Sequence, residues 1–257
     1  MPTLVLLLAL IAGAAPAADE PFQIKDNSFL VEEAFNQERG IFQNIVTFTR
    51  LAGDWNLTFT QEWPAPGVRH QLSYTIPYES VTPGGRGVGD VLINYRYQAI
   101  EEAGGRPAFS PRISLVVPSG RGRRGAGLQV NLPFSKQRNN WYLHWNAGVT
   151  WLPHAALEGE RTAVRLVSPA IAASGIYRMR QMINLMIESV LIWQQMAVGS
   201  GSTRRQTTFT LAPGVRAGRN FGQRQLVGGV AVPIAWTDDT CAAGVLGYVS
   251  YELPFRR

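Results

Sequence analysis

Cysteine, lysine and histidine are scarce in this sequence. Its 257 residues contain one cysteine, Cys241, which leaves neither an internal disulfide nor a cysteine-based metal site. Lys25 and Lys136 are the only lysines among 24 basic residues, and no block of like charge reaches five residues, unlike a basic nucleic-acid tail. The three histidines are scattered, with no carboxylate at ligand spacing. We therefore expect no metal, no cofactor and no nucleic-acid partner.

Long hydrophobic runs are also missing. The one apolar run, from Leu4 to Ala12, is shorter than the ~20 residues that a spanning helix needs, which argues against an uncleaved anchor. It is followed by Ala15-Pro16-Ala17, which fits the A-x-A cleavage pattern. We predict a secretory signal peptide at residues 1–17, an N-terminal segment at 18–40 and one barrel domain at 41–257.

The N-terminal segment carries the one helical pattern of the chain. Residues 27–38 begin with a capping side chain at Asn27 or Ser28 and contain apolar pairs four residues apart, such as Leu30 with Ala34. This pattern predicts a short amphipathic helix that Gly40 ends. The sequence leaves two positions open for it: a plug in the mouth of a barrel, or a helix against the outside of the rim.

Alternation with period two dominates the rest of the chain. In residues 54–63, "DWNLTFTQEW", apolar side chains such as Trp55 and Leu57 alternate with polar ones, which indicates a strand with one apolar and one polar face. Twelve segments share this character, and each is long enough for a tilted membrane strand. They are 41–51, 54–63, 68–78, 90–99, 109–118, 128–135, 141–151, 166–178, 182–196, 207–217, 225–236 and 243–255.

The placement of aromatic residues separates a membrane barrel from a secreted β-sandwich. Large aromatic side chains gather at strand ends on the apolar face, where a membrane barrel has its interfacial girdles, whereas a soluble core needs them in mid-strand. Short and longer connections also tend to alternate. We predict an all-β fold, a twelve-stranded antiparallel transmembrane β-barrel. The predicted girdle is Trp55, Trp63, Tyr78, Tyr97, Trp141, Trp151, Trp193, Trp236 and Phe255.

Four stretches resemble a known family. "GVGDVLINYRYQ" (87–98), "PRISLVVPSG" (111–120), "LAPGVRAG" (211–218) and "QLVGGVAVPI" (225–234) are similar, in this order, to stretches of the bacterial outer-membrane barrels of the MetA-pathway of phenol degradation family. The resemblance covers roughly residues 30–255. It implies a porin-like transporter in the bacterial outer membrane, for small solutes that include hydrophobic or aromatic molecules. It supplies no catalytic residues.

The polar parity of the strands predicts the lining of a lumen. Its charged candidates are nearly balanced in sign, which argues against strong ion selectivity. Two interpretations stay open: charge pairs that brace the wall, or arginines along a solute path. Arg96 and Arg112 would then pair with Asp90, Glu62 or Glu188. The lumen candidates are Glu62, Arg69, Asp90, Arg96, Arg112, Glu188, Arg216 and Glu252, and Lys136 shares their parity.

Two rival functions remain. An outer-membrane lipid hydrolase needs a serine and a histidine together on the lipid face. His70 and Ser73 fall on opposite faces, His144 has no serine two residues on, and His154 lies in a loop, so we predict no enzyme. A structural barrel with an occluded lumen is the second rival. The expected partners are outer-membrane lipid and lipopolysaccharide, whose phosphates suit the arginine-rich loops at 121–124 and 204–205.

Overall fold

The structure is a computed structural model that describes residues 24, 26 and 28–255, except 83–84, 121–124, 157–160, 200, 223 and 239. The described residues form strands and no helix. None of them belongs to a helix long and apolar enough to cross a membrane. The predicted signal peptide and Asn27, the first residue of the predicted helix, lie outside the described residues, as do Arg121, Arg123 and Arg124.

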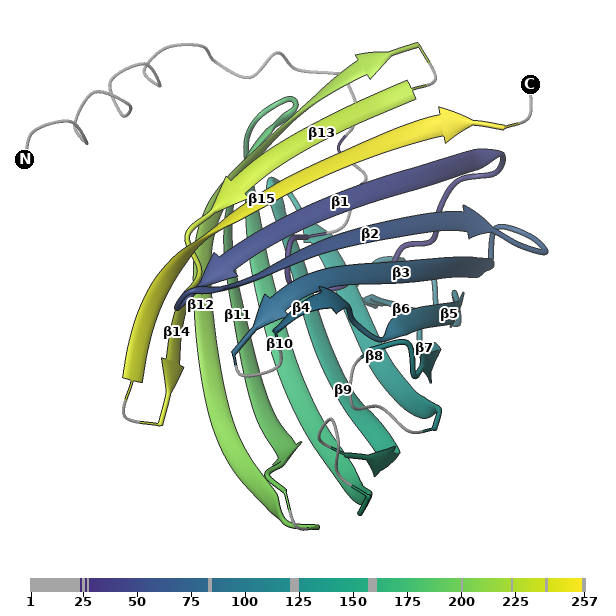
Figure 1. The fold of residues 1–257 in the computed structure, drawn as a ribbon. Helices are drawn as coiled ribbons and strands as arrows, with labels where there is room; N and C mark the ends of the chain where they lie inside the picture. The colour runs from purple at the N-terminus through teal and green to yellow at the C-terminus, as the bar shows by residue number, and fades with distance from the viewer. Residues whose placement is uncertain are drawn as a thin grey trace, which may run out of the picture.

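The strands form one antiparallel sheet that closes on itself (Figure 1). The first strand pairs with the last over its full length, from Ile41 opposite Pro254 to Leu51 opposite Gly244. β4 and β6 are short additions beside β3 and β8, and β13 and β14 share one position, so fifteen strands fill twelve positions in the wall. The strands are β1 Ile41–Leu51, β2 Asp54–Pro64, β3 His70–Val81, β4 Gly85–Val88, β5 Val91–Tyr97, β6 Ala108–Phe109, β7 Arg112–Val117, β8 Gly127–Arg138, β9 Trp141–Ala155, β10 Val164–Arg180, β11 Ile183–Ala197, β12 Thr203–Phe221, β13 Arg224–Ala231, β14 Ile234–Thr237 and β15 Thr240–Pro254.

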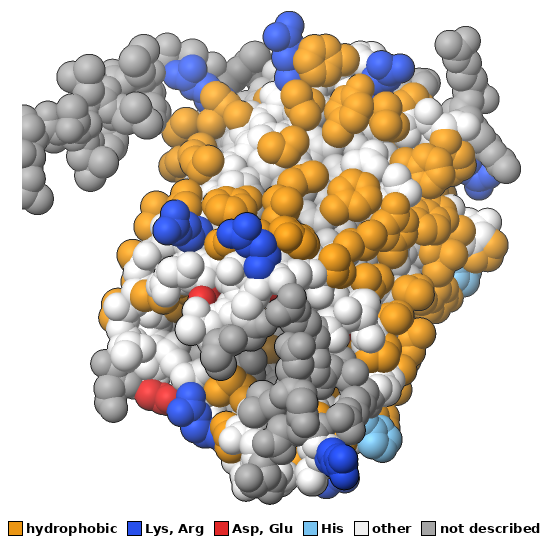
Figure 2. Space-filling view, viewed as in Figure 1, with side chains coloured by type: hydrophobic (Ala, Val, Ile, Leu, Met, Phe, Trp, Pro, Cys, Tyr) orange, Lys and Arg blue, Asp and Glu red, His pale blue; other side chains and the backbone are white. Residues whose placement is uncertain are grey.

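The alternation in the sequence becomes the inside and the outside of this ring. On β9, Trp141, Leu143 and Trp145 are exposed, whereas the intervening His144 is buried. Successive side chains of a strand point to opposite faces, so one parity covers the outside and the other lines the lumen. Hydrophobic side chains accordingly spread over much of the outer face seen in Figure 2. The predicted twelve-stranded antiparallel barrel is confirmed.

Prolines divide two of the predicted strands. The segment 109–118 is β7 with the separate β6 before it, and Pro111 lies between them. The segment 225–236 is β13 and β14, which Val232 and Pro233 separate. Proline has no N–H to donate to a neighbouring strand, so pairing stops there. The Pro233 carbonyl still accepts the Gly244 N–H at 2.8 Å, which keeps the wall joined across the break.

The chain before β1 lies inside the ring. We name residues 28–38 the lumen segment; they have no helical structure, and the predicted helix over 27–38 is wrong for them. A helix would keep its N–H groups for its own carbonyls, whereas here wall side chains accept them, including those of Phe29, Leu30 and Val31. The sequence leaves open whether this segment lies in the mouth of the barrel or against the outside of its rim. In the structure it lies inside the barrel.

Candidate functional site: the occupied lumen

Glu188 on β11 holds the first part of the lumen segment by its main chain. Its carboxylate accepts the N–H of Phe29 at 3.1 Å, of Leu30 at 3.1 Å and of Val31 at 3.2 Å. The side chain is fully buried. Three N–H donors replace the water that such a carboxylate would otherwise need, so Glu188 stabilises the bend of the chain at residues 29–31.

Polar side chains of β8 and β9 continue this main-chain recognition. The Asn146 amide accepts the Glu32 N–H at 2.8 Å and donates to the Glu32 carbonyl at 2.8 Å, as a neighbouring strand would. The Ser135 hydroxyl accepts the Ala34 N–H at 2.7 Å. Further along, the Gln71 side chain accepts the Gln37 N–H at 2.8 Å. The wall thus satisfies the segment's backbone from one end to the other.

Glu32 makes the main ionic contact between the segment and the wall. Its carboxylate lies 2.8 Å from Arg112 Nε and 3.2 Å from Arg96 Nη1, and Asn131 Nδ2 donates to it at 2.6 Å. Burial on its own would raise the pKa of Glu32, but the guanidinium groups of Arg112 and Arg96 outweigh it, and the pKa is lowered. The sequence predicts that Arg96 and Arg112 pair with Asp90, Glu62 or Glu188. In the structure they pair with Glu32 instead.

Glu33 lies in a different environment from its neighbour. Its Oε1 is 3.6 Å from His144 Nε2 and 3.7 Å from Arg216 Nη2, both too long for hydrogen bonds. Burial raises the pKa of Glu33 to about 8; Arg216 opposes this rise and Asp26 adds to it. A negative charge on Glu33 would therefore be only weakly stabilised by its neighbours, in contrast to the charge on Glu32.

The register places a serine beside His144. Ser135 lies opposite His144 across β8 and β9, and its hydroxyl is 2.7 Å from His144 Nδ1. Both side chains are buried on the lumen side, and the Ser135 hydroxyl also accepts the Ala34 N–H. A lipid hydrolase needs such a pair on the lipid face, within reach of its substrate. The pair instead serves to hold the segment.

Phe29 fits a seat made by two glycines. A Cβ atom at Gly229 would lie 2.3 Å from Phe29 Cζ, and one at Gly214 would lie 3.0 Å from its Cε2. On the other side, the ring of Tyr248 has its centre 5.2 Å from that of Phe29. Only glycine on β12 and β13 leaves room for this ring, so the seat fixes the segment's depth in the barrel.

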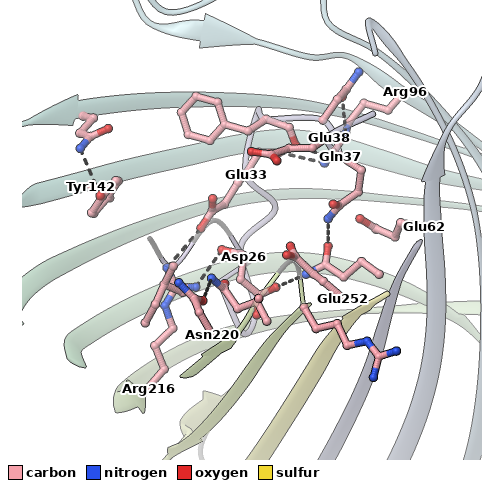
Figure 3. Close-up of a pocket in the computed structure, with 18 residues that line it drawn as sticks. Asp26, Glu33, Gln37, Glu38, Glu62, Arg96, Tyr142, Arg216, Asn220 and Glu252 are labelled. Atoms are coloured by element: carbon pink, nitrogen blue, oxygen red, sulfur yellow. Dashed lines mark hydrogen bonds and ion pairs between the residues drawn. The ribbon is translucent and has the colours of Figure 1, made fainter. Parts of the chain in front are cut away.

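Two cavities remain beside the segment. The larger cavity, about 480 Å³, lies toward the barrel edge that holds Ile41 and Pro254. Figure 3 shows Glu33, Glu62, Arg96 and Arg216 among the side chains around it. The smaller cavity, about 230 Å³, lies nearer mid-barrel between the segment and strands β1–β3. The lumen is thus partly filled, with space on both sides of the segment.

Most of the predicted lumen residues do face the lumen. Arg96, Arg112 and Glu188 bind the segment, as described above. Arg69 is exposed in the turn before β3, where it donates to the Gln98 carbonyl and lies over the Tyr97 ring. Asp90 accepts the Gly120 N–H at 3.0 Å, away from the segment. The lumen candidates that line a cavity or bind the segment are Glu62, Arg96, Arg112, Glu188, Arg216 and Glu252.

The predicted girdle residues lie on the outer face. Trp55 packs against Tyr78 near one barrel edge, with ring centres 5.7 Å apart, and Arg86 lies over the Trp55 ring. Toward the opposite edge, Trp63 packs against Tyr74 at 6.1 Å. Their position at the headgroup level of a membrane stays a prediction. The outward members are Trp55, Trp63, Tyr78, Tyr97, Trp141, Trp151, Trp193, Trp236 and Phe255.

The described residues contain no group of three or more His, Cys, Asp or Glu side chains placed to hold a metal ion. The polar groups of the lumen instead bind one another and the segment.

A closed antiparallel ring with an apolar outside and a polar lumen defines a β-barrel of the outer-membrane type. No protein-family model matches the sequence, and no curated protein matches it. The fold is similar to that of the COG4313 outer membrane channel from Pseudomonas putida F1, with a TM-score of 0.64 and 13% sequence identity. The match covers 85% of this chain and 97% of that chain. The chain therefore has the fold of that channel, and the resemblance to the phenol-degradation family stays a prediction.

Sequence reasoning missed the acid that pairs with the lumen arginines. Glu32 falls within the predicted helix over 27–38, so its place between Arg96 and Arg112 was not predicted. One signal could have indicated this pairing. The segment before the first strand contains an acid, and the inward-facing positions of the strands contain arginines. Asn146 and Ser135 give no such signal, because inward amides and hydroxyls line every polar lumen.

Proposed function

We propose that the protein is an outer-membrane channel that conducts small solutes past the lumen segment. The observation that carries this proposal is the combination of a closed barrel and two unfilled cavities beside the segment, about 480 Å³ and 230 Å³ in volume. A segment that only sealed the barrel would leave no such space. Twelve strands also fall between barrels filled by side chains and those with wide aqueous pores.

The outer face supports a location in a bilayer. Side chains such as Ile93, Ile187 and Val230 are half exposed on the outside of the wall, where water would not favour them. A closed ring leaves no free sheet edge, which lipid requires. The match in fold to a bacterial channel supports the outer membrane in particular.

The class of solute follows from the lining. Amide and charged side chains line both cavities and hydroxyl side chains line the smaller one, with apolar contributions from Phe35, Tyr142 and Leu92. This mixture suits small molecules with a polar group, including those with an aromatic or hydrophobic part. Charges of both signs line the larger cavity, so we expect modest ion selectivity there.

One observation favours a structural barrel instead: the segment is tied to the wall by hydrogen bonds along most of its length. Planar-bilayer recording of the mature protein distinguishes the two functions. A channel gives small, reproducible single-channel steps and lets small solutes swell liposomes. A folded barrel that gives neither would rule out the channel and leave the structural function.

A further inference from the structure

One wall of the lumen is lined by short hydroxyl side chains. On β2 and β3, Thr60 and Thr75 lie opposite each other with their hydroxyl oxygens 2.8 Å apart. Thr47 on β1 lies opposite Thr58 on β2 in the same way. Threonine reaches less far into a lumen than arginine or glutamine, so the wall leaves room beside it. We name Thr47, Thr58, Thr60, Ser73 and Thr75 the hydroxyl wall; all five line the smaller cavity.

Residues 29–34 of the lumen segment are bound to other strands of the wall. Residues 29–31 are held by Glu188 on β11, and Ala34 by Ser135 on β8. Glu32 is held by β5, β7, β8 and β9 together. These bonds hold residues 29–34 toward β5–β11, and the smaller cavity separates them from the hydroxyl wall.

Glu62 on β2 borders both cavities. It lines the smaller cavity together with Thr58 and Thr60, and it lines the larger cavity together with Gln43 and Glu252. Gln71 Nε2 donates to its Oε2 at 2.8 Å, which fixes the direction of the carboxylate. Its side chain is largely buried, so the space around it is narrow. Glu62 therefore lies where the two spaces meet.

We propose that solutes pass along the hydroxyl wall and that Glu62, at the junction of the two cavities, selects for cations and for solutes that donate hydrogen bonds. The proposal rests on the channel function proposed above. Hydroxyl groups replace part of the hydration of a small polar solute as it moves along the wall. A carboxylate at the narrow junction attracts positive charge and repels anions.

Arg96, Arg112 and Arg216 do not cancel this effect, because each is bound to another group. Arg112 faces the smaller cavity, but Glu32 binds its guanidinium group at 2.8 Å. Arg96 contacts the same carboxylate and donates to the Phe35 carbonyl at 2.6 Å. Arg216 donates to the Asp26 carbonyl at 2.8 Å. The segment thus binds Arg112 and Arg96, and the Asp26 carbonyl just before the segment binds Arg216.

Cysteine accessibility tests the path. In a Cys241→Ser protein, Thr58→Cys places a thiol on the hydroxyl wall. Ser174→Cys places one at a buried position where the wall meets the segment, since Ser174 Oγ is 3.3 Å from Ser28 Oγ. A cationic methanethiosulfonate reagent should reduce the single-channel current of the Thr58→Cys protein severalfold and leave the Ser174→Cys current unchanged. The path is overturned if Ser174→Cys is blocked and Thr58→Cys is not, or if both respond equally.

Reversal potentials in a potassium chloride gradient test the selectivity. Glu62→Gln keeps the shape and an acceptor for Gln71 but removes the charge, and the cation-to-anion permeability ratio should fall severalfold. Glu79→Gln is the matched control, because Glu79 accepts from Asn56 on the wall and lines neither of these cavities, and its ratio should change little. An unchanged ratio in Glu62→Gln, in a protein that still conducts, defeats this proposal and leaves the channel standing. A wild-type protein that never conducts defeats the channel function itself.

Discussion

Glu188 on β11 accepts the backbone N–H of Phe29 at 3.1 Å, across 159 residues of sequence. The same carboxylate also binds the next two N–H groups. It thus holds the start of the lumen segment through hydrogen bonds to the backbone rather than to the side chains of these residues. The docking of the segment is therefore governed by a few wall residues, and each can be changed separately.

Replacing Glu188 by glutamine should loosen the segment. The amide offers one acceptor and brings two donors toward N–H groups, so the docked state should lose roughly 1.5–3 kcal/mol. Hydrogen exchange of residues 28–34 should become faster, while the strand amides keep their protection. Glu79→Gln is the control, since Glu79 accepts from Asn56 on the wall. Equal protection of the segment in wild type and Glu188→Gln would show that this anchor contributes little.

The contact between Phe29 and the glycines of β12 and β13 predicts that no side chain larger than hydrogen is tolerated at Gly229. Gly229→Ala would place a methyl 2.3 Å from Phe29 Cζ and should displace the ring, at about 1–3 kcal/mol of docking stability. Gly228→Ala is the matched control, because a Cβ there meets nothing within 4 Å. Adding Phe29→Ala should make the Gly229→Ala change much less costly. A cost that stays the same in the Phe29→Ala protein would mean that the ring is not what limits the site.

The docking of the segment should weaken as the pH rises from about 5 to 8. The pKa of Glu33 is raised from its ordinary value of 4.5 to about 8 by burial, so the docked state keeps a proton in this interval that the undocked state has lost. Deprotonation therefore favours undocking, and the protection factors of residues 28–37 should fall with pH. The lowered pKa of Glu32 acts only at more acidic pH. Glu33→Gln should weaken the trend markedly; a trend of unchanged size there would have another cause.

The alternation of faces predicts opposite results at adjacent positions of β2. Leu57 is exposed on the outer face, whereas Thr58 borders the smaller cavity. Leu57→Arg places a charge against lipid. Because Leu57 pairs with the girdle residue Tyr78, the cost should lie below the roughly 2–4 kcal/mol of the midplane, but it should still reduce the yield of folded barrel. Thr58→Arg should fold nearly as well as wild type, as judged by heat-modifiable mobility on gels. Equal loss at both positions would contradict the assigned inside and outside.

The strands could be predicted because the alternation is a local property of the sequence. The range 41–51 agrees with β1 to the residue, and 54–63 and 182–196 agree with β2 and β11 to within one residue at each end. The lumen segment could not be predicted in the same way. Its helical pattern is genuine, but the hydrogen bonds that Glu188 and Asn146 offer come from residues more than 100 positions away.

The candidate site was predicted in part. The alternation of polar and apolar side chains was enough to place Glu62, Arg96 and Arg216 inside the barrel, because it is a local property of each strand. It could not place Arg69, which lies in a turn where alternation ends. It also could not reveal which acid pairs with Arg96 and Arg112, because that depends on how the chain before β1 folds back into the lumen.

The central claim is that the segment narrows a conducting path and is held there by Glu32. Planar-bilayer conductance of wild type and of the Arg96→Ala/Arg112→Ala protein tests it most directly. Removing both guanidinium groups leaves the Glu32 carboxylate buried without its ion pairs, at about 3–5 kcal/mol, so the segment should leave its site. We predict small conductance steps in wild type and larger steps in the double variant. Zero conductance in both proteins, with the barrel still folded, would contradict the account.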